Sequence, residues 1–411
     1  MSAAVMANVN LIRNIGLGDS ATGLRTSTIN ETTVATSDGT VFVTGNWFAS
    51  SSLNDGKDWT QVDPFTALPP AADGFCCDQI VLYEPSRDVW MWILQYAAVP
   101  GGNNVFRIAV APGATPTTWQ WWDIAPTDLD PAWTNLWFDY PDAACSSNHL
   151  YVTFNVFDHR DDWRRAVAFK LPLDMLSMGD QLTHQWWTTT RNGSLRLTQG
   201  ATDRMFFASH NAGRTLRVHG WPDDSPTVGS FDVQVGSWAA GPYNSPGPDG
   251  SNWLGRPVDS RITGGWIGGT RAGFLWTAGP KSGRPVPYVK GAVVDVTTQL
   301  LVEEPDIWNE ESAYAYPAAC PNSAGVVGVS LMTGGGPRHP SHVVGFRDGA
   351  EWRLKTARAG THGPAPGKWG DYLTCRRHHP DTSEWVASGY TLQGGTDRRN
   401  TEPQYVHFGI G

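Results

Sequence analysis

A chain of 411 residues usually divides into two or three domains, although a radially repeated all-β fold can hold this length in one domain. Only 17% of the residues are charged, whereas 45 glycines, 29 prolines and 21 tryptophans favour many tight turns between short aromatic strands. The net charge of −9 argues against nucleic acid or an anionic membrane as a partner, and no apolar run reaches the roughly 18–20 residues that span a bilayer.

A single pattern of residues returns seven times along the chain. Each copy has a short apolar strand, a turn rich in Pro, Asp, Asn or Gly, and a second strand rich in aromatic residues. The mean period, taken from Glu31 to Asp371, is roughly 57 residues, longer than the ~40–50 residues of the best-known propeller repeats. The seven copies are NETTVATSDGTVFVTGN, CDQIVLYEPSRDVWMWILQY, YPDAACSSNHLYVTFN, GSLRLTQGATDRMFFASH, DSRITGGWIGGTRAGFLWTAG, YPAACPNSAGVVGVSLM and GDYLTCRRHHPDTSEWVASGY.

In chain order, the first predicted element is an alternating strand at residues 7–14, and the seven copies follow it. Most copies continue into a third strand, such as VFRIAVAP, and a fourth, such as WQWWDIAP. Strands joined in fours by hairpins are typical of propeller blades. We therefore predict an all-β fold, a seven-bladed β-propeller of four-stranded antiparallel blades that forms one domain over residues 1–411. The predicted blades span residues 30–65, 74–126, 137–190, 191–240, 257–308, 312–359 and 367–411.

The seventh copy supplies only three strands up to Gly411. We expect the strand at residues 7–14 to pair with the segment Pro403–Gly411 as the fourth strand of this blade. This pairing would close the ring and remove the exposed edges that an open array would leave.

The five cysteines are predicted to differ in chemical state. Cys145, Cys320 and Cys375 occupy matching places in the repeat, so we expect them to be small buried side chains with free thiols. Cys76 and Cys77 are adjacent, and the sequence leaves open whether they form a vicinal disulfide or stay as two thiols.

The first copy ends in SSLNDGKDWTQV, a tight turn followed by a strand with a tryptophan. Through Ser52, Asn54, Asp55, Gly56 and Trp59, this segment resembles the Asp-box, S-x-D-x-G-x-x-W, of sialidase-like (BNR-type) β-propellers. The last copy resembles the final blade of secreted bacterial Asp-box proteins. The resemblance implies a propeller fold and an extracellular or periplasmic location, although the start MSAAVMANVNLIRN lacks a basic-then-apolar leader. No local motif matches the sialidase catalytic set.

Propeller topology predicts where a site would form. The connection into each inner strand and the loop after each second strand open on the same face, around the mouth of the central channel. The catalytic candidates at these positions are His210, Asp78, Asp371, Asp259, Tyr96 and Tyr390. The substrate-binding candidates are Arg261, Asn46, Asn155, Trp276 and Trp369. Each candidate also has a structural explanation, because aspartates before strands cap turns and histidines at strand ends are often hydrogen-bonded into the fold.

The first functional hypothesis is an enzyme that cleaves glycans at this mouth. A glycoside hydrolase needs two carboxylates on either side of the scissile bond, and Asp78 with Asp371 or Asp259 would fit that role. Trp276 and Trp369 are predicted to stack on sugar faces.

A polysaccharide lyase is the alternative cleavage chemistry. It needs a neutral base, here His210, Tyr96 or Tyr390, and an arginine such as Arg261 to neutralise a uronate. The sequence alone does not separate the two chemistries.

The second hypothesis is a lectin-like or surface-interaction propeller without catalysis. A lectin propeller normally repeats its binding residues in every blade, whereas the residues that open the inner strands here differ from blade to blade. This asymmetry favours one enzyme site for a carbohydrate or another small polar substrate. No motif for an organic cofactor is present, and a ring of carboxylates in the channel could hold Ca²⁺.

Overall fold

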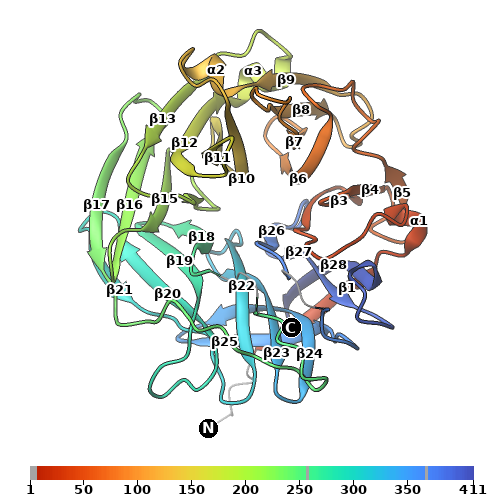
Figure 1. Cartoon of the computed structure of the whole chain (residues 1–411), viewed down its shortest axis with the longest axis vertical. Coiled ribbons are helices and arrows are strands. Elements are labelled where there is room, and N and C mark those ends of the chain that lie inside the picture. Colours follow the sequence, from red (N-terminus) through yellow and green to blue (C-terminus); the bar gives the residue numbers. More distant parts are fainter. Residues whose placement is uncertain (1–6, 256–258, 366–368) are drawn as a thin grey trace.

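The structure, a computed structural model, describes residues 7–255, 259–365 and 369–411. Seven four-stranded antiparallel sheets surround a central axis (Figure 1), which confirms the predicted seven-bladed β-propeller. The predicted starts of the fifth and seventh blades, at residues 257 and 367, lie outside the described residues. In the described ranges, no helix is both long and apolar enough to cross a membrane.

The strands of the first four blades follow the chain from the inside of each blade outward. They are β2 (Thr33–Ser37), β3 (Thr40–Gly45), β4 (Phe48–Ser52) and β5 (Thr60–Val62); β6 (Phe75–Glu84), β7 (Val89–Tyr96), β8 (Phe106–Pro112) and β9 (Gln120–Ile124); β10 (Leu136–Cys145), β11 (His149–Asp158), β12 (Trp163–Pro172) and β13 (Gln185–Thr189); and β14 (Arg196–Leu197), β15 (Arg204–His210), β16 (Thr215–Pro222) and β17 (Gly229–Gln234).

The remaining three blades follow the same order. Their strands are β18 (Ile262–Gly268), β19 (Arg271–Ala278), β20 (Tyr288–Asp295) and β21 (Leu300–Glu303); β22 (Ala313–Pro321), β23 (Val327–Gly335), β24 (Arg338–Asp348) and β25 (Glu351–Arg358); and β26 (Thr374–Arg377), β27 (Trp385–Leu392), β28 (Thr401–Ile410) and β1 (Val9–Gly16). The short helices are α1 (Asp19–Thr22), α2 (Pro126–Leu129), α3 (Leu173–Met178) and the 3₁₀ turn η1 (Arg398–Asn400).

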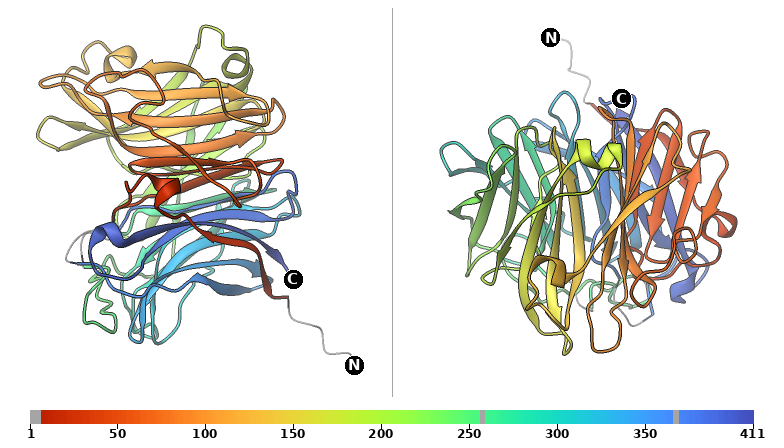
Figure 2. Two further views of the ribbon diagram at one scale, coloured as in Figure 1. Left: turned by 90° about the vertical axis from the view of Figure 1, so that its right-hand side faces the viewer. Right: turned by 90° about the horizontal axis from the view of Figure 1, so that it is seen from above.

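The N-terminal strand closes the ring, as predicted. β1 pairs antiparallel with β28, from Val9 opposite Ile410 to Gly16 opposite Gln404, so the first and last strands of the described residues lie in one blade (Figure 2). The Asn14 amide also donates a hydrogen bond of 2.6 Å to the carbonyl of Ala357 in the neighbouring blade. The seventh blade therefore depends on strands from both ends of the sequence.

The core lies between the faces of adjacent blades. All eight residues of β7 are buried, because neighbouring sheets cover both faces of this second strand. Phe42 from the first blade packs edge-on against Trp92 of β7, with ring centroids 5.4 Å apart. Large flat rings fill the wedge between blades, which explains the high tryptophan content.

The turn that resembles an Asp-box joins β4 to β5. The Ser52 hydroxyl accepts a hydrogen bond from the Gly56 amide, and the Asn54 side chain accepts one from the Asp58 amide. Trp59 packs edge-on against Tyr405 of β28, 6.1 Å away. These contacts stabilise the turn and its packing on the closing blade.

Candidate functional site

The inner strands of four blades are bulged. Register shifts interrupt β6, β10, β18 and β22. The bulges of β10 and β22 contain Tyr140 and Tyr316, with φ of 56° and 55°, a backbone conformation that residues other than glycine rarely adopt. Bulges of this kind redirect side chains and are frequent next to functional sites.

One arginine at this mouth contacts two carboxylates from different blades. The Nη2 atom of Arg261 lies 2.5 Å from Oδ2 of Asp259, and its Nη1 atom lies 3.9 Å from Oδ2 of Asp371. Because the same planar guanidinium contacts both, the two carboxylate oxygens lie at most roughly 9 Å apart, which does not exceed the separation of up to about 9.5 Å found in glycosidase carboxylate pairs. The structure thus brings together three of the predicted site residues.

Buried tyrosines surround this cluster. The Arg261 guanidinium stacks on the ring of Tyr140 at 4.4 Å, and Tyr140 packs edge-on against Tyr372 at 5.9 Å. Burial, with a smaller contribution from the charges of Asp371 and Asp259, raises the pKa of Tyr316. Burial also raises the pKa of Tyr140 and Tyr372. These phenols therefore stay neutral and can donate hydrogen bonds.

A second arginine beside the cluster is also paired with an acid. Arg196 Nη1 lies 2.6 Å from Oδ1 of Asp142, whose other oxygen accepts a hydrogen bond from the Leu197 amide. Asp78 lies close enough to Tyr372 for its charge to raise the pKa of that phenol, after the larger effect of burial. Arg261 and Arg196 are thus each engaged by a carboxylate.

His210 lines a pocket of about 420 Å³ together with Asn155, Asp259 and Arg261. Its Nε2 lies 2.6 Å from the carbonyl of Ser260, so Nε2 carries the proton and Nδ1 is left as the acceptor. Burial lowers the pKa of His210 to about 4, which keeps the ring neutral at neutral pH. Four predicted site residues therefore share one pocket.

The other aromatic candidates are directed into the core. Tyr96 and Tyr390 are each only 1% exposed, and Trp276 and Trp369 are fully buried. The Tyr96 hydroxyl accepts a hydrogen bond of 2.8 Å from Arg107, and the Tyr390 hydroxyl donates one of 2.6 Å to the Trp369 carbonyl. These four side chains form walls behind the mouth rather than its surface.

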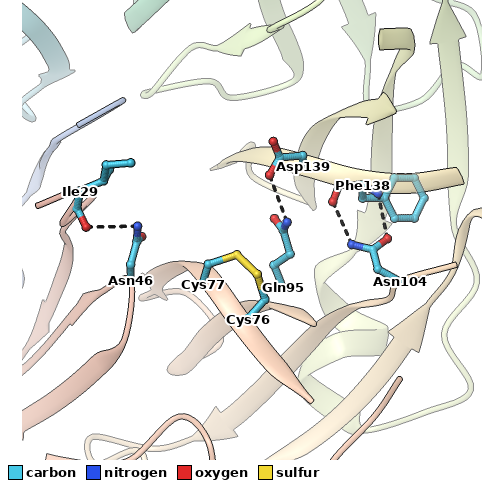
Figure 3. The surroundings of a disulfide bond; sticks show 8 residues. All are labelled: Ile29, Asn46, Cys76, Cys77, Gln95, Asn104, Phe138 and Asp139. Atoms are coloured by element: carbon cyan, nitrogen blue, oxygen red, sulfur yellow. Dashed lines mark hydrogen bonds between the residues drawn. A yellow bond between two sulfur atoms is a disulfide. The ribbon is translucent and has the colours of Figure 1, made fainter. Parts of the chain in front are cut away.

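Two asparagine candidates hold loops in place. The Asn155 side-chain oxygen accepts a hydrogen bond of 2.7 Å from the Ser194 amide, and its nitrogen donates one to the Ser194 hydroxyl. The Asn46 amide donates one of 3.3 Å to the carbonyl of Ile29. Asn155 nevertheless lines the pocket, whereas Asn46 lies in the first blade, near the disulfide described next (Figure 3).

Cys76 and Cys77 form a vicinal disulfide in the bulge of β6 (Figure 3). Asn46 and Gln95 lie on either side of it, and Gln95 donates a hydrogen bond of 3.1 Å to Asp139 of the next blade. The sequence had left both redox states open. The other three cysteines carry free thiols, as predicted, with Cys320 and Cys375 buried and Cys145 only half-buried.

Sequence reasoning missed Tyr140 and Arg196. The signal for Tyr140 was present, because a Tyr-Pro pair opens two copies of the repeat, at residues 140–141 and 316–317. Arg196 has no such signal, since its position beside Asp142 depends on packing between the third and fourth blades. Within the described part of the chain, no three metal-ligating side chains at the mouth have ligand atoms within 4.8 Å of one another.

Sequence comparisons with protein-family models and with curated proteins gave no match. Solved structures similar to this chain include the GH93 α-L-arabinofuranosidase of Fusarium graminearum with arabinobiose (9% identity, 97% of each chain covered, TM-score 0.47). The Penicillium chrysogenum α-L-arabinanase complexed with arabinobiose is 9% identical, with 98% of each chain covered and a TM-score of 0.43. The Trypanosoma rangeli sialidase is 11% identical and covers 79% of this chain and 54% of its own, with a TM-score of 0.40. At these sequence identities and TM-scores, the structural similarity carries no information about activity.

Proposed function

We propose that this protein is a glycoside hydrolase with one asymmetric site at the mouth of the propeller. The observation that carries the proposal is the pair of carboxylates, Asp259 and Asp371, that the guanidinium of Arg261 brings to within roughly 9 Å. Hydrolysis of a glycosidic bond needs a carboxylic acid that protonates the leaving oxygen and a carboxylate that attacks the sugar or activates water.

The two carboxylates differ in access to solvent, which suggests their roles. The Asp259 side chain is 45% exposed and lines the pocket, so we assign it as the carboxylate that attacks or activates water. The Asp371 side chain is 14% exposed and lies on the other side of Arg261, and we assign it as the acid. Arg261 is a positioning residue that sets the distance between them.

The charge of the mouth favours a neutral sugar over a uronate. A lyase needs a cation that is available to neutralise the substrate carboxylate, whereas Arg261 and Arg196 both bind aspartates of this chain. Asp78 adds a further negative charge near Tyr372. An anionic substrate would be repelled here, so hydrolysis of a neutral glycan fits the site better than lysis.

The test is a screen of the full chain against neutral aryl glycosides and neutral polysaccharides for reducing-end release, in parallel with uronate polymers for unsaturated products. We expect turnover of a neutral glycan that Asp371→Asn and Asp259→Asn strongly reduce, while Asp295→Asn, in a half-buried turn-capping aspartate of the fifth blade, retains it. Unsaturated products that persist in Asp371→Asn would instead establish a lyase. Glycan binding without turnover, unchanged by either substitution, would establish a lectin.

A further inference from the structure

A second cluster of reactive side chains lies in the seventh blade, at the end of β26 away from Asp371. His378 directly follows β26, Glu384 directly precedes β27, and His407 lies in β28. One ligand atom from each of these three side chains lies within 4.8 Å of the other two. In the described ranges, this is the only group of three or more histidine, cysteine or acidic side chains that meets this distance.

The contacts within the cluster already bring its donor atoms together. His407 Nε2 lies 2.5 Å from Oε2 of Glu384, and the rings of His378 and His407 are stacked with centroids 3.9 Å apart. His378 Nδ1 lies 3.3 Å from the carbonyl of Asp381. A metal-binding histidine usually donates a hydrogen bond from its other ring nitrogen to a group such as a backbone carbonyl. With Nδ1 of His378 bonded in this way, its Nε2 is the atom that would bind an ion.

The charged side chains around the cluster are mostly acidic. An imidazole binds a metal ion through a ring nitrogen that carries no proton. The charges of Asp55 and Asp381 act on His407, and the nearby Arg13 is engaged by Asp55 at 2.8 Å. A divalent ion would supply a counter-charge to the Glu384 carboxylate.

We propose that His378, Glu384 and His407 bind a divalent transition-metal ion of the Zn²⁺ class. Two imidazole nitrogens and one carboxylate oxygen are a donor set that suits Zn²⁺, and three protein ligands leave one position of a tetrahedron for water. Coordination needs the two stacked rings to tilt toward a common point. His378 lies in the turn between β26 and β27, where this movement disturbs no strand pairing.

The position of the proposed site indicates how a bound ion would affect the stability of the fold. His407 lies directly opposite Arg13 of β1 in the sheet, so the ion would tie the β26–β27 turn to the strand on which the ring closes. Metal that binds only the folded chain stabilises it by mass action. We therefore assign the site a stabilising role in the closing blade, independent of the mouth.

The experiment uses the full chain treated with EDTA and then titrated with ZnCl₂ in a calorimeter. We expect one Zn²⁺ per chain and a rise in Tm of roughly 2–4 °C at a hundredfold excess over Kd. His378→Gln and Glu384→Gln should each weaken binding at least about tenfold. His379→Gln is the matched control, because this adjacent half-buried ring contacts Tyr83 instead.

Co²⁺ spectroscopy separates this site from the free thiols. Ligand-field bands of a tetrahedral N/O site that disappear in His378→Gln, with no thiolate charge-transfer band, support the proposal. Should His407→Gln, in a strand, fail to fold, the two turn variants still decide the question. Unchanged Zn²⁺ binding in both folded turn variants, a thiolate band, or no Zn²⁺ binding at all would overturn it.

Discussion

The guanidinium of Arg261, which opens the fifth blade, lies 3.9 Å from the carboxylate of Asp371, which opens the seventh. The same guanidinium holds Asp259 at 2.5 Å and stacks on Tyr140 of the third blade. Three separate blades therefore meet at one side chain.

Asp371→Asn should reduce turnover of the glycan substrate by about 10²–10⁴-fold, because the amide cannot deliver a proton to the leaving oxygen. The free energy of unfolding should change little, because Asn has nearly the same size and shape as Asp. Steady-state kinetics and urea unfolding of the wild type, Asp371→Asn and Asp295→Asn give both values. Full activity in Asp371→Asn would remove this residue from the mechanism.

Thiol titration should distinguish the two classes of cysteine. In denaturant without reductant, three thiols are expected, from Cys145, Cys320 and Cys375, and all five cysteines should react after reduction. In the native protein, Cys145 should react first, because it is half-buried at an opening of about 330 Å³, while the other two are buried. Five reactive thiols without reductant would contradict the vicinal disulfide.

Removing β1 should destabilise the ring. Deleting residues 1–16 leaves β28 as an unpaired edge and should lower the free energy of unfolding by about 3–5 kcal/mol, through lost backbone pairing and packing. A synthetic peptide of residues 7–16 should restore part of the lost Tm, whereas a scrambled peptide of the same composition should not. Thermal unfolding followed by circular dichroism checks this, and an unchanged Tm after the deletion would refute the role of β1 in closure.

Acid should weaken the fold partly through buried histidines. His342 is fully buried and its Nε2 lies 2.8 Å from the Ser330 hydroxyl, and burial lowers its pKa to about 4. Between about pH 6.5 and 4, the unfolded chain binds a proton that the folded His342 does not. The free energy of unfolding therefore falls as the pH falls through this window, by up to about 1.4 kcal/mol per pH unit.

His342→Gln keeps a hydrogen-bonding group beside Ser330. It should lower the slope of the unfolding free energy against pH by an amount that corresponds to about one proton taken up on unfolding. His210 and His219, whose pKa is also lowered to about 4 by burial, contribute with the same sign and remain in the variant. Urea unfolding at several pH values checks the slope, with His159→Gln, at an exposed position, as the control. An unaltered slope in His342→Gln would show that its imidazole does not contribute.

The sequence by itself determined the number of blades, the four-stranded pattern and the closing strand. These features are local, because alternation along each strand and the residues in each turn specify a hairpin without reference to distant parts of the chain. The segment at residues 7–14 was recognisable because the seventh copy lacked a fourth strand. The topological argument predicted that Asp259, Arg261, Asp371 and His210 lie near one another; Arg261 contacts Asp371, and it lines one pocket with Asp259 and His210.

Only the tertiary structure decided which candidates face that mouth. A one-residue bulge reverses the direction of the following side chains, and the alternation of apolar and polar residues in β10 and β22 does not show where their bulges redirect them. Tyr96, Tyr390, Trp276 and Trp369 were indistinguishable in sequence from mouth residues, yet packing between blades buries all four. The contacts of Arg261 with Asp371 and of Arg196 with Asp142 join different blades, so they exist only once those blades have packed together.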